Sequence, residues 1–283
     1  MLNNAADQGD IANGTELAKE RRIPINPIKF GRSGAQYRYD KETNSIYKGI
    51  ASIKYFNAAV ADKLAELRAS DYETFSDVLI AVAPILDERQ LNILIKLGYF
   101  SEYGKSKELL RLAGLYVTGL KKGDAKTVSP DKFPIDFPFS ECCRCYGKDE
   151  KRLARYPITD MRKLLKLAEG YILSEDGDDF SLMEIIAFQN EYLGYVDYVS
   201  NDPDDIQKIY VEAVFPVKRR SDQKIFAYNI ISRSIGTGKA QRFTVFASTY
   251  EADPFKAGSI IEVVKFDKNS RGYWCIFGYN LVV

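Results

Sequence analysis

Apolar residues recur with two different periods along the chain. Between residues 49 and 115 they return every three or four positions in four short stripes, two of which end before Pro84 and at Gly98. This is the period of an amphipathic helix, so the stripes predict four short helices in a compact helical domain. From Gln207 onwards apolar and polar residues alternate, in runs separated by polar or glycine-containing turns. Such alternation is typical of half-buried β-strands.

The alternating region has the size and strand number of a small Greek-key barrel. We expect about five strands in the 77 residues from 207 to 283, as in the OB-fold. Strict alternation places Val211 and Phe215 on one face of the first strand and Glu212 on the other. A β-sandwich and an SH3-like barrel fit the same pattern. The predicted runs are Gln207–Phe215, Lys224–Ile231, Gln241–Ala247, Ser259–Phe266 and Tyr273–Val282.

These patterns predict a multi-domain α+β protein, in which a small helical domain is followed by a five-stranded OB-like β-barrel. Before the helical domain we expect one short helix, Thr15–Arg22, and a β-hairpin of Gln36–Asp40 and Ser45–Lys48. After it comes an irregular, acidic connector with helices at Met161–Leu173 and Leu182–Tyr195. The predicted domain bounds are 1–48, 49–115, 116–206 and 207–283.

The chain contains no histidine. This excludes hydrolases with a Ser-His-Asp or Cys-His system and zinc hydrolases of the H-E-x-x-H type. Three of the four cysteines are Cys142, Cys143 and Cys145, which are too few for a disulfide framework and lack the further ligands of a zinc site. We therefore expect free thiols, no metal and no cofactor. The N-terminus is polar and no apolar run reaches the ~18 residues of a membrane span, so we expect a cytoplasmic protein.

The formal net charge of +1 hides an uneven distribution of charge. Residues 157–206 contain 3 basic and 12 acidic residues, whereas residues 207–283 contain 12 basic and 6 acidic ones. A basic terminal module behind an acidic segment indicates a polyanionic partner for that module, although a solvated charged surface would have the same composition.

Cations lie on or beside the first three predicted strands of the barrel, with aromatic residues among them. Proteins bind single-stranded nucleic acid with such a combination, because cations follow the phosphates and aromatic rings stack on bases. The aromatic residues fit a barrel core equally well. The candidate cations are Lys218, Arg219, Arg220, Lys224, Arg233, Lys239 and Arg242, and the candidate aromatic residues are Phe226, Tyr228 and Phe243.

Four segments, in their order along the chain, resemble parts of one known family. They are Glu16–Ile28, Ile46–Lys54, Arg89–Phe100 with Tyr103–Gly104, and Phe188–Tyr195. They resemble, in turn, the end of the fingers, the opening of a helix-hairpin-helix, the element that follows it and the helix ahead of an OB domain. The family is that of the bacterial family C replicative polymerases, the alpha subunit of DNA polymerase III, and the chain resembles its C-terminal part. The family's catalytic palm and its phosphoesterase domain lie upstream of the matched segments and have no counterpart in this sequence.

The resemblance implies DNA binding without catalysis by the chain alone. The helical domain would hold primer-template duplex and the barrel single-stranded template, beside a polymerase catalytic body that supplies nucleotide transfer. Lys48 and Lys54 would contact phosphates. In the family a Gly-h-Gly hairpin brings bare backbone N–H groups close to phosphate. Here those positions are Tyr55-Phe56-Asn57, where Asn57 tolerates the left-handed conformation and Tyr55 adds a bulky side chain.

Other interpretations stay open at this point. The family also docks on the sliding clamp through a short Gln-x-x-hydrophobic-aromatic segment, of which residues 140–206 contain no clean copy. A structural or assembly protein that binds a polymerase body or a sliding clamp is favoured by the acidic segment and the altered hairpin. An independent enzyme is a third interpretation, but the sequence contains no visible nucleophile–base pair or metal-ligand cluster to support it.

Overall fold

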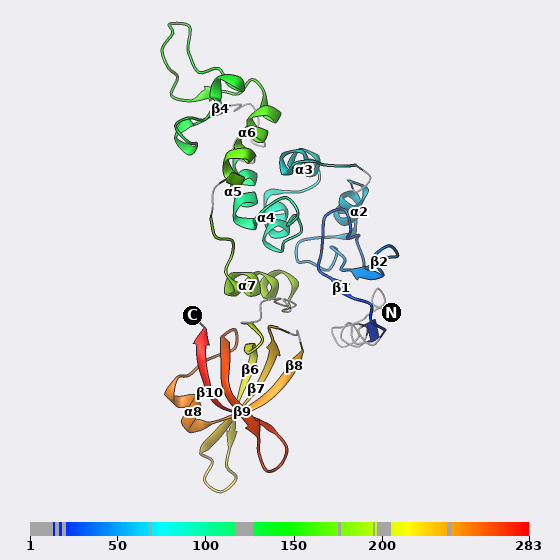
Figure 1. Cartoon of the computed structure of the whole chain (residues 1–283), viewed down its shortest axis with the longest axis vertical. Coiled ribbons are helices and arrows are strands. Elements are labelled where there is room, and N and C mark those ends of the chain that lie inside the picture. Colours follow the sequence, from blue (N-terminus) through cyan, green and yellow to red (C-terminus); the bar gives the residue numbers. More distant parts are fainter. Residues whose placement is uncertain are drawn as a thin grey trace. The chain divides into compact units, whose positions relative to one another are not determined.

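The computed structural model divides the chain into two compact units, Met1–Ser181 and Leu182–Val283 (Figure 1). The structure describes residues 14, 17–18, 21–67, 70–116, 127–174, 177–194, 196, 205–236 and 239–282. Half of the predicted helix Thr15–Arg22, residues 15, 16, 19 and 20, lies outside these residues. None of the described helices combines the length and the apolar character that crossing a membrane requires.

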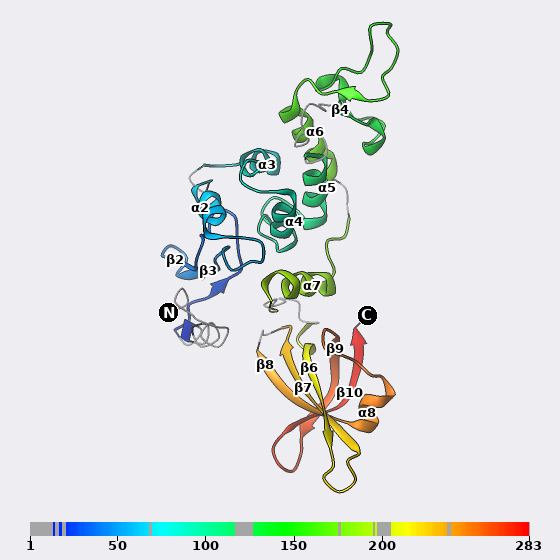
Figure 2. The ribbon, with the colours of Figure 1, turned by 180° about the vertical axis from the view of Figure 1, so that it is seen from behind.

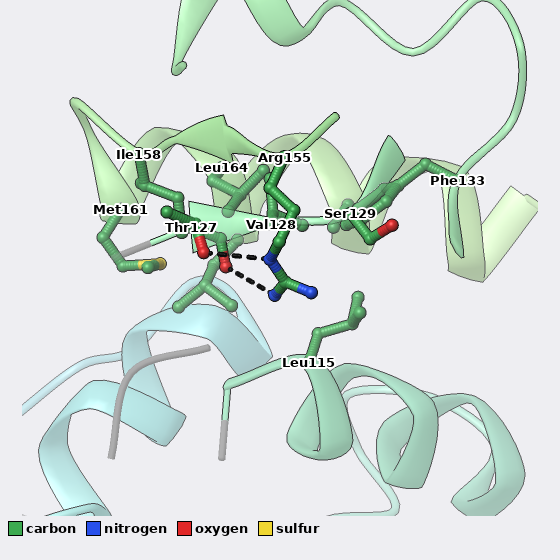
Figure 3. Close-up of a pocket in the computed structure, with 11 residues that line it drawn as sticks. Leu115, Thr127, Val128, Ser129, Phe133, Arg155, Ile158, Met161 and Leu164 are labelled. Atoms are coloured by element: carbon green, nitrogen blue, oxygen red, sulfur yellow. Dashed lines mark hydrogen bonds between the residues drawn. The ribbon is translucent and has the colours of Figure 1, made fainter. Parts of the chain in front are cut away.

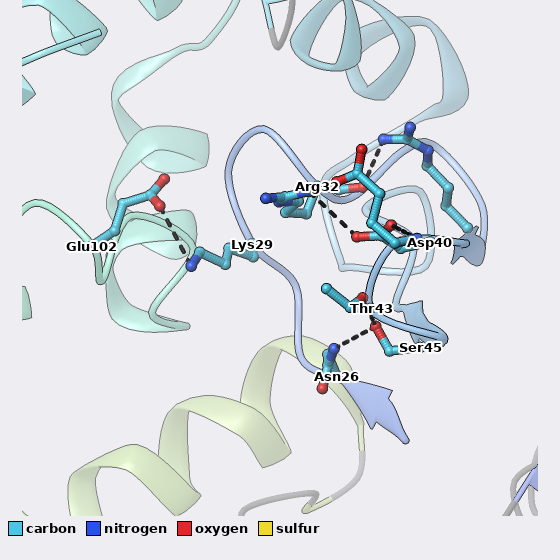
Figure 4. A network of polar contacts seen from close by, with 9 residues as sticks. Asn26, Lys29, Arg32, Asp40, Thr43, Ser45 and Glu102 are labelled. Carbon is cyan, nitrogen blue, oxygen red and sulfur yellow. Dashed lines mark hydrogen bonds and ion pairs between the residues drawn. The ribbon is translucent and has the colours of Figure 1, made fainter. Parts of the chain in front are cut away.

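The first unit begins with a small three-stranded sheet. The predicted hairpin is confirmed as β2 (Arg38–Asp40) and β3 (Ser45–Tyr47), and β1 (Ile25–Asn26) adds to β3 in parallel. Polar side chains fix the surrounding loops (Figure 4). Asn26 Nδ2 donates to Ser45 Oγ at 3.0 Å, Arg32 Nη1 to Asp40 Oδ2 at 3.3 Å, and Lys29 Nζ lies 3.4 Å from Glu102 Oε2.

The four predicted helices follow, and two of them end as predicted, before Pro84 and next to Gly98. They are α2 (Ala58–Glu66), α3 (Phe75–Val82), α4 (Glu88–Lys96) and α5 (Ser106–Tyr116). Asn57 and Thr74 cap α2 and α3, and Asp87 forms a capping box with Gln90 at α4. Gly98 takes a left-handed φ of 74° just after α4, which is a conformation that glycine adopts without strain.

An aromatic core holds these elements together. The ring of Phe30 lies 5.4–6.2 Å, centroid to centroid, from the rings of Tyr72, Tyr99, Phe100 and Tyr103. The Phe30 N–H also donates to the Tyr99 carbonyl at 2.8 Å, so this loop residue is fixed by both packing and a hydrogen bond.

The rest of the first unit is built on α6 (Met161–Ser174). The short strands β4 (Thr127–Val128) and β5 (Tyr156–Pro157) pair beside two 3₁₀ helices, Pro130–Lys132 and Phe139–Glu141. Three phenylalanines attach this segment to a core, because Phe133, Phe137 and Phe139 pack on one another and on Tyr156 and Tyr171. A cavity of about 80 Å³ lies next to β4 and α6, where Arg155 donates to the hydroxyl and carbonyl oxygens of Thr127 (Figure 3).

The second unit is a closed barrel, as the alternating pattern predicts. Its strands are β6 (Lys208–Lys218), β7 (Ile225–Ser234), β8 (Ala240–Phe246), β9 (Ile260–Lys268) and β10 (Trp274–Val282). They pair in the order β10-β8-β7-β6-β9, and β9 closes on β10. The β8–β10 pair is parallel, and the unpredicted helix α8 (Ala247–Ala252) connects β8 to β9. This arrangement is OB-like and rules out the sandwich for this unit.

One prediction about the barrel is wrong. The pairing of β6 with β7 shifts between Val211 and Ala213, so Glu212 is an extra residue in a β-bulge. The bulge reverses the alternation beyond it. Val211 and Val214 therefore both contact the core, whereas Phe215 is 52% exposed and does not share a face with Val211.

Helix α7 (Leu182–Leu193) belongs to the barrel unit rather than to a separate connector. Its Ile186 packs in one buried cluster with Tyr210 of β6, Ile260 of β9 and Ile235. The unit boundary at Ser181–Leu182 therefore falls inside the predicted connector 116–206, because the apolar face of α7 is buried against the barrel. The finer predicted bounds at 48/49 and 115/116 stay predictions.

Candidate nucleic-acid interface

Four of the predicted cations gather on the β6–β7 hairpin. Lys218, Arg219, Arg220 and Lys224 are all exposed. The Arg219 N–H donates to the Lys224 carbonyl at 2.9 Å, which closes the turn and places these side chains on one short loop. Arg219 also lies 6.0 Å from the ring centroid of the exposed Phe226. The hairpin therefore combines positive charge with an aromatic surface.

The other predicted cations lie toward the far end of β7 and β8. Arg242 is exposed and is paired in register with Ile231, and Lys239 is exposed just before β8. Arg233 is half-buried, and its Nε donates to Glu212 Oε1 at 2.9 Å. The β-bulge thus supplies a carboxylate that balances part of this charge. From Ile225 to Arg233 strand β7 spans about 26 Å at ~3.3 Å per residue.

Two of the predicted aromatic residues point into the barrel. Phe243 belongs to its buried core, and the ring of Tyr228 stacks on Tyr250 of α8 with centroids 3.9 Å apart. Neither is placed to stack on a base outside the barrel. Residues two positions apart on a strand point to the same face of the sheet. Ile230 and Val245, which follow Tyr228 and Phe243 by two positions, are core residues, so Tyr228 and Phe243 face the inside of the barrel as well.

The outer face of the barrel carries aromatic residues that the sequence reasoning missed. Phe246 alternates with the core residues of β8, and Phe277 is 41% exposed on the neighbouring β10. Their rings lie 6.0 Å apart, and Phe215 is exposed on β6. Alternation along β8 would have placed Phe246 on the outer face once Phe243 and Val245 were assigned to the core. The outward orientation of Phe215, in contrast, depends on the β-bulge and could not be read from alternation.

The β9–β10 hairpin is a second group of cations and aromatic rings. Tyr273 and Trp274 are 66% and 43% exposed, and Lys268 Nζ lies 4.8 Å from the Trp274 ring centroid. Phe266 packs on Trp274 from the paired strand at 5.5 Å. This hairpin and the β6–β7 hairpin both project from the end of the barrel opposite α7 (Figures 1 and 2). In OB-folds, the loops at these two positions and the face of the second and third strands bind oligonucleotides.

The predicted duplex-binding residues of the first unit are placed differently from one another. Lys54 is exposed on the hairpin before α2. Lys48 is only 9% exposed, so we do not include it among the DNA-contacting residues proposed below. Asn57 does not take the left-handed conformation that the sequence allows. It has φ −130° and caps α2 by accepting the Val60 N–H at 2.9 Å.

Tyr55 is the hairpin residue with the left-handed backbone, at φ 71°. Two residues of α4 hold it there. Gln90 Nε2 donates to the Tyr55 carbonyl at 2.8 Å, and the Arg89 guanidinium lies 3.3 Å from the centroid of the Tyr55 ring. Ile50 and Ile53 of the same hairpin are buried and attach it to the core.

The adjacent thiols are not arranged for nucleophilic chemistry. Cys142 and Cys143 are buried with their Sγ atoms 3.8 Å apart. Burial raises the pKa of both thiols, and that of Cys143 reaches about 12. They are therefore protonated at neutral pH and poor nucleophiles.

Comparison with known families identifies one domain within the first unit. Residues 22–110 match the helix-hairpin-helix motif. Such a domain is consistent with DNA binding, and it includes Lys54, Tyr55 and Arg89. No curated protein matches the chain. The helix-hairpin-helix domain and the OB-like barrel together indicate a DNA-binding protein.

Proposed function

We propose that the chain is the DNA-handling part of a bacterial family C replicative polymerase. In this account the barrel binds single-stranded template and the helix-hairpin-helix domain binds primer-template duplex. Nucleotide transfer belongs to a polymerase catalytic body outside these 283 residues. The four ordered segments that resemble the family support the replicative context.

The observation that carries the proposal is the distribution of side chains on the barrel. Exposed cations on the β6–β7 hairpin and Arg242 on β8 flank a face with outward aromatic rings, among them Phe246 and Phe277. Cations attract the phosphates of a flexible single strand and rings stack on its bases. Such a face would contribute less to the binding of a duplex, because the bases of a duplex are already stacked on one another.

Fluorescence anisotropy with the whole chain tests the proposal. The probes are a labelled oligo-dT of about 20 nucleotides, longer than the ~4–16 nucleotides that one OB-fold covers, and a primer-template duplex of similar length. We expect both to bind at ~50 mM salt and their affinity to fall steeply toward ~200 mM. Arg242→Gln should weaken oligo-dT binding, whereas Lys256→Gln, the same charge change in the α8–β9 connection, should not. Absence of binding at ~50 mM salt contradicts the proposal.

The second candidate is an assembly protein that binds a polymerase body or sliding clamp rather than DNA. The observation that favours it is Tyr55, whose side chain occupies the place where the family's hairpin exposes bare backbone. Retention of a polymerase body or a clamp by the immobilised chain, without retention of either DNA probe, would select this function over the first.

A further inference from the structure

The hairpin before α2 presents one open aromatic face. The guanidinium of Arg89 covers one side of the Tyr55 ring, with its Cζ 3.3 Å from the ring centroid. Tyr55 as a whole residue is nevertheless 51% exposed. Because one face is covered, this exposure comes from the opposite face and the ring edge. The structure thus places a flat apolar surface at the tip of a hairpin that is expected to approach DNA.

Residues next to Tyr55 stabilise a backbone conformation that a tyrosine does not favour. A left-handed φ of 71° is strained for a residue with a side chain, and glycine would adopt it freely. The Gln90 side chain fixes the Tyr55 carbonyl at 2.8 Å and at the same time closes the capping box of α4 with Asp87. Strained residues that several contacts fix in this way are found at binding and catalytic sites more often than elsewhere.

Two cations accompany the ring. Lys54 precedes it and Arg89 stacks on it, and both side chains are exposed. Within the described part of the chain, no carboxylate lies within ion-pair distance of either one. Their charge is therefore available for an external anion, while the ring keeps one face for a planar group.

We propose that Tyr55 and Arg89 form a stacking site for the first unpaired nucleobase at a junction between duplex and single strand. Lys54 and Arg89 hold the phosphates on either side of that base. This inference rests on the proposed DNA binding and adds the part of the substrate that the hairpin recognises. Inside a duplex the faces of the bases are covered by their neighbours, whereas an unpaired base at a junction offers a free face to an aromatic ring.

The test uses the whole chain and a hairpin DNA whose stem ends in a single unpaired nucleotide, 2-aminopurine. One nucleotide is shorter than the ~4 nucleotides that an OB-fold needs, so the barrel contributes little. Stacking on a tyrosine ring quenches 2-aminopurine fluorescence. We expect quenching with the wild type and with Tyr55→Phe, which keeps the ring. Tyr55→Gly should not quench and should bind this probe about tenfold more weakly, because one base stack is lost.

Blunt duplex of the same stem is the reference ligand. Tyr55→Gly should bind it at least as well as the wild type, because glycine fits the left-handed position and exposes the backbone. Arg89→Gln, which leaves the hairpin backbone unchanged, should bind the junction more weakly than the wild type. Equal quenching and equal junction affinity in wild type and Tyr55→Gly would overturn the stacking site but leave DNA binding intact. If the wild type binds neither probe nor oligo-dT, the proposed function fails as well.

Discussion

Glu169 of α6 caps the first turn of α3 by binding Ser76 twice. Its Oε2 accepts from the Ser76 N–H at 3.0 Å and from the Ser76 hydroxyl at 2.5 Å, and its Oε1 accepts from the Phe75 N–H at 2.7 Å. All three residues are buried, so the carboxylate supplies partners that water does not. A residue more than 90 positions away in the sequence thus completes the cap that Thr74 begins.

Glu169→Gln should therefore destabilise the first unit by about 2 kcal/mol, since hydrogen bonds to a buried charged group are lost and an amide N–H₂ faces the helix N–H donors. Urea unfolding followed by far-ultraviolet circular dichroism measures this change. Glu66→Gln, at an exposed position of α2, is the matched control and should change the free energy of unfolding by less than ~0.5 kcal/mol. Equal effects of the two substitutions would contradict the role of the cap.

Tyr99→Phe should stabilise the protein or leave it unchanged. Tyr99 is fully buried, and among the described residues its hydroxyl is the buried side-chain polar atom that has no hydrogen-bond partner. Removing an unsatisfied hydroxyl removes a desolvation penalty of ~1 kcal/mol or more. Tyr279→Phe is the contrast, because the Tyr279 hydroxyl donates to the Asp253 carbonyl at 2.6 Å and its loss should cost about 1 kcal/mol. Thermal unfolding of both variants measures the difference. A loss of stability in Tyr99→Phe would contradict the prediction.

Asp77 should make the first unit sensitive to acid. The hydrogen bond from the Thr74 hydroxyl, at 2.7 Å, and the Lys166 ammonium, at 3.1 Å, hold the pKa of Asp77 below its ordinary 3.8, against the opposing effect of burial. A carboxyl whose folded pKa is depressed contributes stability that is present above its unfolded pKa and is lost as the pH falls through the folded value. The free energy of unfolding should thus fall more steeply below about pH 4 in the wild type than in Asp77→Asn. Parallel profiles for the two proteins would show that Asp77 does not contribute.

Aromatic residues of the barrel should divide into a structural and a binding group. Phe277→Ala should leave the barrel folded and weaken oligo-dT binding by roughly 1–3 kcal/mol, which corresponds to the loss of one stacked base. Phe243→Ala should instead destabilise the barrel by about 3–5 kcal/mol, because it empties part of the core. Val264→Ala, at a position of β9 that is 60% exposed, is the control for both. Unchanged DNA affinity in Phe277→Ala would remove the outer face from the proposed interface.

The sequence was sufficient to predict the helices and strands that are specified by neighbouring residues in the chain. Apolar periodicity and the end signals at Pro84 and Gly98 account for α2 to α4, and alternation accounts for the five strands. The helices and strands depend on residues that are close together in the chain, so a single sequence contains the information. Strand number and length favoured an OB-like barrel but fitted a sandwich as well, and the pairing of distant strands separated the two.

The orientation of candidate site residues depended on contacts between distant segments. The bulge at Glu212 arises from pairing with β7 and reverses the face of Phe215. Tyr228 is covered by Tyr250 of α8, a helix that the sequence did not predict. The left-handed backbone of Tyr55 depends on Gln90, which lies 35 residues further along the chain. The cations of the β6–β7 hairpin are exposed, and their role in DNA binding stays a prediction. Composition could not assign the aromatic residues to the core or to the surface.

The most direct test of the central claim, that the barrel binds single-stranded DNA through its cationic hairpin, is the salt dependence of oligo-dT affinity. The variant replaces Lys218, Arg219, Arg220 and Lys224 by Gln in the whole chain. Each phosphate contact on a single strand contributes about −0.7 to the slope of log affinity against log salt. The account predicts a steep slope for the wild type and a slope smaller by up to about 3 for the variant. An identical slope and affinity for the two proteins would contradict it.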